Sequence, residues 1–402
     1  MLRFKMKYDF DRIIDRCDTH SVKWDSCFLK ERFKIDDVLP LWVADMDFQC
    51  PQPVIDALKK RAEKGIYGYC WFKTPTYLDA VSNWMKGRHK WKIDNEWIVF
   101  SPGIVPAIKM LVQTFTNVGE KIIIQPPVYY PFFSAVKNNG RILLENKLCY
   151  ENKKYTFDFE DFEEKTKDPL TKMFILCSPH NPVGRVWTEK ELRKLGDICL
   201  ENDVLIISDE IHHDLILSGY KHTLFSTISE DFERNTIICT APSKTFNIAG
   251  LNTSNIIIPD EKMRESFINT ISNRNSVMSP NVFGIVALIA AYNEGEEWLN
   301  QALRYIETNF RYLKQFINES IPNIDFIDPE GTYLAWLDCN KLGMIDEELS
   351  EFMLKRAKVA LDDGKIFGSG GEGFERINIA CPKSILEECM IRIVNALKER
   401  RW

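Results

Sequence analysis

The segment MFILCSPHNPVGRVWTEKELRKLGDICLENDVLIISDE, residues 173–210, indicates the fold of this chain. Met173–Cys177 and Val204–Ser208 are continuous apolar runs, which are typical of strands buried on both faces of a parallel sheet. Between them, a capping box at Thr188 and Glu191 starts an amphipathic helix. Strand, helix and strand in this order predict a βαβ unit.

The same alternation of strand and helix extends on both sides of this unit. Apolar runs and the amphipathic patterns that follow them predict three further strands and two further helices. These are the strands Ile98–Phe100, Lys121–Ile124 and Thr236–Cys239 and the helices Gly103–Phe115 and Pro131–Lys137. We therefore predict an α/β fold whose large domain, residues 55–290, is built on a mostly parallel, doubly wound sheet.

The last third of the chain has a different pattern, in which long helical segments surround short strands. The predicted helices are Glu296–Ser320, Asp346–Arg356 and Lys383–Lys398, and the strands lie near Thr332–Leu337 and Arg376–Ala380. This pattern predicts a smaller α+β C-terminal domain over residues 291–402. Residues 1–54 are expected to form an extended arm, with a strand near Leu41–Ala44, that packs on the small domain.

The composition is that of an ordinary globular protein and argues against several other classes. The 402 residues include 58 acidic and 52 basic ones, with a net charge of −6 and no basic run, so no nucleic-acid partner is expected. The N-terminus, MLRFKMKYDFDRIID, lacks the apolar core of a signal peptide. The least charged stretch, Asn275–Asn293, contains Pro280, Gly284 and several polar residues, so its apolar part is too short to span a membrane, and it is predicted to be a buried helix. Eleven cysteines without a C-x-x-C pair indicate reduced thiols and a cytoplasmic location.

The residues that follow the predicted strands are candidate site residues. In sheets of this kind, ligands bind beyond the carboxyl ends of the strands. The sequence places there a helix start at Gly103-Ile104, the aromatic Tyr129, the amide of Asn181, the carboxylate of Asp209 and the amine of Lys244 after Ser243. Each has an ordinary structural explanation when taken alone, but the set as a whole is typical of one cofactor.

This set matches the requirements of a pyridoxal 5'-phosphate site. A lysine forms a Schiff base with the cofactor and moves protons, and a carboxylate keeps the pyridine nitrogen protonated so that the ring accepts electrons. An aromatic side chain stacks on the ring, and an amide binds the ring hydroxyl oxygen. The free N–H groups of a helix start bind the phosphate. We therefore expect pyridoxal 5'-phosphate as the cofactor.

The order Tyr129, Asn181-Pro182-x-Gly184, Asp209-Glu210, Ser243-Lys244 resembles the fold-type I aminotransferase superfamily, aminotransferase classes I and II. Seven longer segments are similar to one branch of it, the MalY/PatB family. Its members are cystathionine β-lyases, also called cysteine-S-conjugate β-lyases or C–S lyases. The segments are LWVADMDF (41–48), GIYGY (65–69), SPHNPVGRVWT (178–188), SDEIHHDL (208–215), SKTFNIAGL (243–251), GTYLAWLD (331–338) and GEGFERINIACP (371–382). The resemblance extends over residues 8–398 and implies the fold of a fold-type I pyridoxal phosphate-dependent transferase.

The resemblance implies that Lys244, Asp209 and Tyr129 are the catalytic residues. Lys244 is expected to carry the cofactor as a Schiff base, Asp209 to pair with its ring nitrogen and Tyr129 to stack on its ring. Asn181 is expected to contact the ring hydroxyl oxygen.

The resemblance also implies residues for the phosphate and the substrate. Gly103, Ile104 and Ser243 are expected to hold the phosphate, and Arg376 to bind the carboxylate of a small-molecule amino-acid substrate, for which its planar fork is suited. Tyr69 is expected to reach the phosphate or the substrate of a neighbouring subunit, because family members are homodimers with shared active sites.

Two positions depart from the wider aminotransferase pattern. Many aminotransferases have a tyrosine three residues after the aspartate, where this chain has His212, and an arginine eight residues after the lysine, where it has Asn252. Both departures match the C–S lyase branch. His212 is thus either a cofactor-binding residue or a packed histidine, and the phosphate is expected to have one cation fewer than usual.

Two further motifs superficially match binding sites. Residues Gly368–Gly373 fit G-x-G-x-x-G, but they follow no convincing strand and open no predicted helix, so a dinucleotide site is not expected. His212 and His213 are adjacent and lack the i, i+4 spacing of helical ligands, so no metal site is expected.

The resemblance implies pyridoxal phosphate-dependent β-elimination of cysteine S-conjugates such as L-cystathionine, giving a thiol (homocysteine), pyruvate and ammonia. The alternative is an aminotransferase that acts on an amino acid and a 2-oxo acid, since both reactions begin with removal of the Cα proton. A binding or regulatory protein that retains the cofactor is a third possibility. The preferred S-substituent stays open, with Tyr67, Trp71, Phe72 and Tyr130 as candidate pocket walls.

Overall fold

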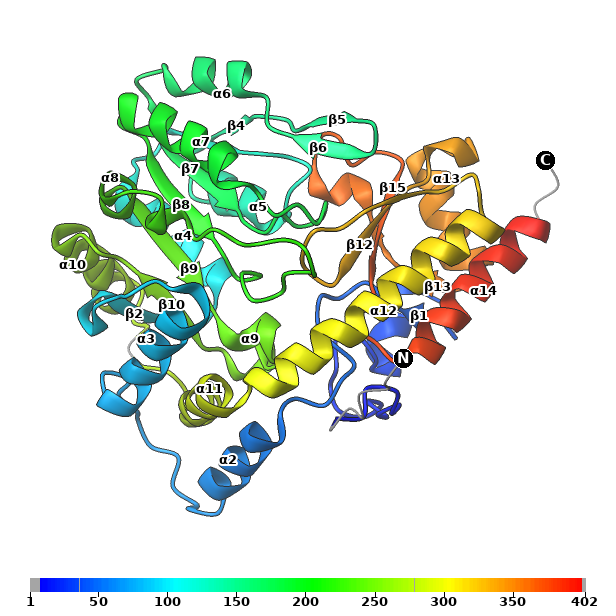
Figure 1. Cartoon of the computed structure of the whole chain (residues 1–402), viewed down its shortest axis with the longest axis horizontal. Helices are drawn as coiled ribbons and strands as arrows, with labels where there is room; N and C mark the ends of the chain where they lie inside the picture. Colours follow the sequence, from blue (N-terminus) through cyan, green and yellow to red (C-terminus); the bar gives the residue numbers. More distant parts are fainter. Residues whose placement is uncertain (1–7, 36, 278, 400–402) are drawn as a thin grey trace.

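The computed structural model describes residues 8–35, 37–277 and 279–399. Two lobes lie side by side, and the long helix α12 (Glu296–Ser320) runs from one to the other (Figure 1). The larger lobe is built around a seven-stranded sheet and the smaller one around a four-stranded sheet.

The sheet of the large lobe has the strand order β2-β10-β9-β8-β7-β3-β4. Its strands are parallel except β10, which runs antiparallel to both of its neighbours. The strands are β2 (Ile98–Ser101), β3 (Lys121–Ile124), β4 (Ile142–Glu145), β7 (Thr171–Cys177), β8 (Leu205–Asp209), β9 (Thr236–Thr240) and β10 (Ser254–Ile257). The predicted α/β fold with a mostly parallel sheet is confirmed, and β4 and β10 are additional to the five predicted strands.

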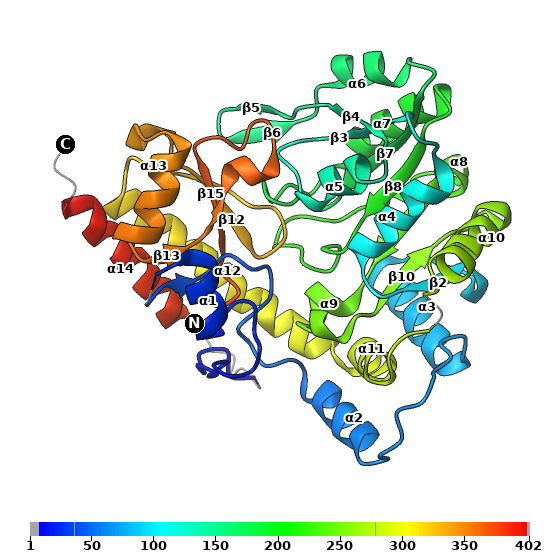
Figure 2. The same cartoon turned by 180° about the vertical axis from the view of Figure 1, so that it is seen from behind.

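Helices cover both faces of this sheet, which explains why its strands are apolar throughout. Along β3, Ile122 and Ile124 pack in one core and Ile123 in the other, because successive side chains of a strand point to opposite faces. One face carries α3 (Pro75–His89), α7 (Glu189–Glu201), α8 (Glu230–Arg234) and α11 (Val282–Glu294), and the other carries α4 (Ile104–Phe115), α5 (Pro131–Lys137) and α10 (Glu261–Asn269). Helix α7 lies in front of the sheet in Figure 1, and α4 lies in front of it in Figure 2.

The starts of two predicted helices are set by side-chain caps. The capping box of α7 is present, since the Thr188 N–H donates to Glu191 Oε2 at 2.8 Å and the Glu191 N–H donates to Thr188 Oγ1 at 3.3 Å. Asn281 caps α11, so only the second part of the low-charge stretch Asn275–Asn293 is in this buried helix. Met278 of that stretch lies outside the described residues. Among the described residues, no helix has the length and apolar character needed to cross a membrane.

The small lobe has an antiparallel sheet of order β11-β12-β15-β14. Its elements are β11 (Asp325–Ile327), β12 (Leu334–Asp338), β14 (Asp362–Asp363), β15 (Phe374–Asn378), α13 (Asp346–Glu351) and α14 (Lys383–Glu399). The predicted helix Asp346–Arg356 is formed by α13 and a π-helical turn, Phe352–Arg356, that follows it directly. Residues Gly368–Gly373 lead directly into β15, not into a helix, which removes the structural context of a dinucleotide motif.

The N-terminal arm differs from the predicted extended segment. It contains the helix α1 (Ser26–Phe33), whose first amides are capped by Asp25. Its strand is β1 (Leu39–Pro40), which pairs with β13 (Val359–Ala360) of the small lobe. The strand predicted near Leu41–Ala44 is thus displaced to Leu39–Pro40. Leu41 still pairs through its backbone with Ala360 and Asn378, but the carbonyls of Trp42, Val43 and Ala44 bind side chains from elsewhere in the chain. Residues 1–7 of the predicted arm lie outside the described residues.

The remaining elements lie at the periphery. They are α2 (Gln52–Ala62), α6 (Phe159–Thr166), the hairpin β5 (Cys149–Glu151) and β6 (Lys154–Thr156), and the short helix α9 (Pro242–Thr245) after β9. Helix α2 packs against α11, and in both views the segment that leads from α2 to α3 projects at the edge of the molecule (Figures 1 and 2). The boundary between the large and small domains at residue 290 stays a prediction.

Candidate active site

A cavity of about 230 Å³ lies at the carboxyl ends of the central strands of the large sheet, next to the start of α4. Eight predicted site residues line it together: Gly103, Ile104, Tyr129, Asn181, Asp209, His212, Ser243 and Lys244. Asn252, which occupies the position of the usual arginine, also lines it. Arg376 contacts this set through Asn181, whereas Tyr69 does not belong to the cavity of its own chain.

The start of α4 offers unpaired backbone donors to the cavity. The helix begins at Ile104, and Pro106 has no N–H group, while the Ala107 N–H donates to Gly103 O at 3.1 Å. The amides of Ile104 and Val105 therefore have no helical acceptor, and these two residues line the cavity. Such a helix start binds anions, which fits the predicted phosphate site.

Asp209 is the last residue of β8 and is 3% exposed. Its Oδ1 accepts a hydrogen bond of 3.1 Å from the Ile211 N–H. Burial raises the pKa of Asp209 to about 7, with a smaller contribution in the same direction from Glu210, whereas the Ile211 hydrogen bond and Lys244 oppose the rise. The ionised carboxylate is thus costly without a further cationic partner in the cavity.

This raised pKa gives a prediction for the cofactor-free protein. Between pH 3.8 and about 7 the native state holds a proton on Asp209 that the unfolded chain releases, so stability falls as the pH rises through this window. We expect Asp209→Asn, which stays neutral, to raise the free energy of unfolding by about 2 kcal/mol at pH 8 and by less at pH 5. Urea unfolding of both proteins at both pH values measures this, and an equal gain at the two values would contradict it.

Lys244 lies on the short helix α9, where its amine reaches back to the N-terminal arm. Its Nζ donates to the carbonyl oxygen of Ala44 at 2.6 Å. Burial lowers the pKa of Lys244 to about 8; Arg376 lowers it further, whereas Asp45 and Asp209 oppose this. A lysine with such a pKa has an appreciable neutral fraction near pH 7 and is able to act as a base.

Arg376 extends from β15 of the small lobe toward Asn181 of the large lobe. Its Nη1 donates to Asn181 Oδ1 at 3.0 Å, and its Nη2 donates to the carbonyl oxygen of Trp42 at 2.9 Å and to Asp362 Oδ2. Its Nε is buried and has no hydrogen-bond partner in the described part of the chain. The predicted carboxylate-binding arginine thus lies next to the predicted cofactor-binding amide and retains a free donor.

Tyr129 and His212 complete the walls of the cavity. The ring of Tyr129 packs edge-on against Phe132, with 6.0 Å between centroids, and burial raises its pKa well above the usual value. Burial also lowers the pKa of His212, so this imidazole is neutral, and its Nδ1 has no hydrogen-bond partner among the described residues. His212 packs against Tyr333 and also lines the cavity, so it makes a packing contact and faces the predicted cofactor site.

Tyr69 lies on the projecting segment between α2 and α3. Its side chain is fully exposed, and Tyr67 and Trp71 beside it are also exposed. Among the described residues, Tyr69 is not one of those that line the cavity of its own chain. The expectation that it reaches a neighbouring subunit stays a prediction.

Two structural features of this site were not predicted from the sequence. The first is the backbone of Trp42–Asp45, whose carbonyls accept hydrogen bonds from Arg376, Asn378, Lys244 and Tyr333. The second is Asp362, which pairs with Arg376. The first segment belongs to the motif LWVADMDF, but every residue has a backbone carbonyl, so the sequence does not indicate which carbonyls accept hydrogen bonds at the site. Asp362 belongs to none of the motifs.

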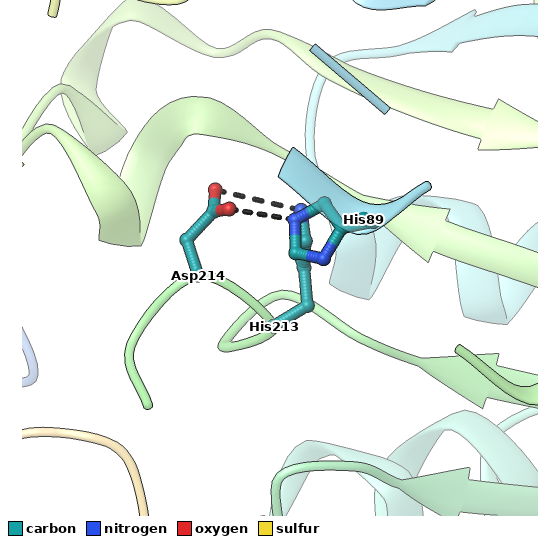
Figure 3. Close-up of side chains that lie close together, drawn as sticks. All are labelled: His89, His213 and Asp214. Carbon is teal, nitrogen blue, oxygen red and sulfur yellow. Dashed lines mark hydrogen bonds and ion pairs between the residues drawn. The ribbon is translucent and has the colours of Figure 1, made fainter. Parts of the chain in front are cut away.

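A polar cluster of His89, His213 and Asp214 (Figure 3) lies next to the turn that carries Lys244 and contacts it through Thr245. Asp214 Oδ2 accepts a hydrogen bond of 2.8 Å from the hydroxyl of Thr245, and Asp214 Oδ1 lies 2.7 Å from His89 Nε2. His213 Nε2 lies 3.4 Å from Asp214, and the Arg88 and Trp84 side chains also contact this carboxylate, each at 3.2 Å. Potential ligand atoms of His89, His213 and Asp214 lie within 4.8 Å of one another. However, the Asp214 carboxylate already accepts hydrogen bonds from several side chains and forms an ion pair with the cation Arg88. The cluster therefore fits a hydrogen-bonded support better than a metal site.

The residues of the cavity fit pyridoxal phosphate. The unpaired amides of Ile104 and Val105 are donors for a phosphate, and the buried carboxylate of Asp209 lacks a cation such as a protonated ring nitrogen. The neutral fraction of Lys244 is available to a carbonyl carbon. The site therefore matches a ligand that has an anionic group at one end, bound by the amides, and a protonated ring at the other end, paired with Asp209.

Comparison with known proteins gives independent information. The family model described as "Aminotransferase class I and II" matches residues 36–393. The chain is 46% identical over 391 residues to cystathionine beta-lyase PatB of Bacillus subtilis (strain 168), covering 97% of this chain and 100% of that protein. It is 32% identical over 394 residues to protein MalY of Escherichia coli (strain K12), covering 98% and 100%. The crystal structure of the PLP-bound C-S lyase from Staphylococcus hominis matches with a TM-score of 0.92 and 37% identity, covering 98% and 100%.

Proposed function

Because this chain belongs to the aminotransferase class I and II family, and within it to the MalY/PatB cystathionine β-lyases, we propose that it is a pyridoxal phosphate-dependent C–S lyase that acts on cysteine S-conjugates. β-Elimination of L-cystathionine with uptake of water gives homocysteine, pyruvate and ammonia. The observation that carries the proposal is the meeting of Lys244 and Asp209 in one cavity, beside the paired Asn181 and Arg376.

The chain supplies a complete set of cofactor contacts. We assign the phosphate to the start of α4 and to Ser243, and the ring to Asp209, Tyr129 and Asn181, with His212 beside them. Pyridoxal phosphate, when bound, supplies a ring that accepts the electron pair left at Cα after the proton is removed. Asp209 favours this by providing a fixed negative charge in a dry environment.

Arg376 and Lys244 act on the substrate itself. Arg376 binds the α-carboxylate with its free donors, which orients the amino acid in the cavity. Lys244 then accepts the Cα proton, since its lowered pKa makes a neutral amine available. Loss of the sulfur substituent from Cβ completes the elimination, and the thiol leaves.

Transamination is the second candidate function. It uses the same residues up to removal of the Cα proton, and the wider family includes aminotransferases. The chain's similarity to cystathionine β-lyases favours elimination. The two reactions differ in their need for a 2-oxo acid, which only transamination consumes.

We also propose a homodimer in the cytoplasm, in which Tyr69 enters the active site of the partner. The support is the exposed position of Tyr67, Tyr69 and Trp71 on a segment that extends away from its own lobes (Figure 2). Aromatic side chains of this kind are common at protein interfaces. The same segment is then available to bind the S-substituent of the substrate.

The reaction itself is tested with purified, cofactor-loaded protein and L-cystathionine, without added 2-oxo acid. We expect sustained release of pyruvate and of free thiol in equal amounts, because elimination regenerates the enzyme without an acceptor. The measurement is a coupled assay for pyruvate together with a thiol titration. Release of neither product, with rapid turnover only after addition of an amino-acid donor and a 2-oxo acid, would establish the aminotransferase instead.

A further inference from the structure

Asp362 is the carboxylate that lies against the guanidinium of Arg376. The two residues are opposite each other in the antiparallel pair β14 and β15, so their side chains point to the same face of the sheet. Asp362 Oδ2 accepts a hydrogen bond from Arg376 Nη2. The side chains are only 8% and 3% exposed, which makes this a buried ion pair.

The guanidinium of Arg376 is held from several sides. Asp362 and the carbonyl oxygen of Trp42 both accept from Nη2, and Asn181 accepts from Nη1. The guanidinium carbon lies 4.9 Å from the centre of the Phe367 ring. Because these contacts occupy Nη2, the donors that remain for a substrate are on Nε and Nη1.

A second guanidinium group, that of Arg32, also acts on Asp362. Burial raises the pKa of Asp362, whereas Arg376 and Arg32 of α1 oppose this rise by favouring the ionised carboxylate. The Arg32 guanidinium lies 4.3 Å from the centre of the Trp42 ring. Two guanidinium groups thus act on one carboxylate. Asp362 therefore holds Nη2 of Arg376 while the buried Nε of the same guanidinium keeps a donor for a second carboxylate.

We infer that Asp362 is a positioning residue that holds Arg376 in the orientation needed to bind the α-carboxylate of the substrate. The inference rests on the proposed function, in which Arg376 binds this carboxylate. Without Asp362, Nη2 loses its charged acceptor and the guanidinium is free to turn toward other groups. Affinity for a free α-carboxylate then falls, whereas the part of the binding that depends on the substrate amine is unaffected.

The test compares L-alanine with L-alaninamide, which lacks the carboxylate charge. Both are titrated into cofactor-loaded protein, and binding is followed by the change in the visible absorbance of the cofactor. For Asp362→Ala we expect the Kd of L-alanine to rise about 10–100-fold, while the Kd of L-alaninamide changes less than about twofold. For Asp362→Asn, whose amide oxygen still accepts from Nη2, we expect a rise of only about 2–5-fold for L-alanine, which keeps the test usable if the alanine variant does not fold.

Two further variants separate the outcomes. Asp363→Asn removes the same charge from the neighbouring residue of β14, which contacts Lys365 instead of Arg376, and it should leave both Kd values unchanged. Arg376→Lys should abolish most of the preference for L-alanine. If it does not, the assigned role of Arg376 in the proposed function fails. If Arg376→Lys loses the preference but the Asp362 variants keep it, or weaken both ligands equally, only the inference about Asp362 is overturned.

Discussion

The variant Lys244→Ala is expected to catalyse β-elimination of L-cystathionine at a rate lower than that of the wild type by a factor of about 10⁴ or more. Its Nζ is the group that we assign both to the cofactor carbonyl and to the Cα proton, so one substitution removes two functions. Lys244 Nζ is the amine that lines the cavity with Asp209 and Asn181. The measurement is the initial rate of pyruvate release, together with the visible absorbance of the cofactor-loaded protein, which should be lost or shifted.

The fold should survive this substitution. Within the described part of the chain, the side chain of Lys244 makes one hydrogen bond, to the carbonyl oxygen of Ala44, and its buried ammonium is itself unfavourable. The free energy of unfolding should therefore change by no more than about 1 kcal/mol. Circular dichroism and urea unfolding check this. Lys190→Ala, an exposed lysine of α7, serves as the matched control and should retain full activity. A Lys244→Ala protein that turns over at the wild-type rate would rule out the assigned role.

The variant Asp209→Asn is expected to lower kcat/KM by about 10²–10³-fold. The amide has the same shape and still accepts the hydrogen bond from the Ile211 N–H, but it carries no negative charge toward the protonated ring nitrogen. The effect is therefore electrostatic and not steric. Steady-state kinetics with L-cystathionine measure it, and Asp197→Asn, an exposed carboxylate of α7, is the control that should leave the rate unchanged.

Activity and stability should move in opposite directions in this variant. The same burial that raises the pKa of Asp209 makes its charge costly in the cofactor-free protein, so Asp209→Asn should gain stability at pH 8 while it loses catalysis. A variant that loses both would show that Asp209 acts as a structural residue. A variant that keeps full activity would show that no charge is needed at this position.

Most of the large lobe was predictable because the signals for it are local. Continuous apolar runs define the central strands, and the capping box of Thr188 and Glu191 defines the start of α7. The exceptions have physical reasons. β10 is antiparallel and begins with the polar residues Ser254 and Asn255, and β4 is at the sheet edge, where its side chains are mostly half-buried. A short strand without a strong apolar pattern is difficult to recognise from the sequence.

The N-terminal arm was the least predictable region. The segment Leu41–Ala44 has the composition of a strand, yet its carbonyls bind Arg376, Asn378 and Lys244. These partners are 200 to 335 positions away in the sequence. Local propensity cannot indicate such contacts, because tertiary packing decides which acceptors the backbone meets.

By itself, the sequence determined the strand ends of the large lobe and the chemistry that stands at each of them. The carboxyl ends of parallel strands meet at one edge, so the positions of Tyr129, Asn181, Asp209 and Lys244 in one cavity follow from the order of the strands. Only the tertiary structure decided how Arg376 joins this set. Its orientation depends on Asp362, on the carbonyl of Trp42 and on Asn181, which come from three separate parts of the chain. The physical reason is that a strand end is fixed by local backbone geometry, whereas the direction of a buried guanidinium is fixed by partners that only the packed lobes bring together.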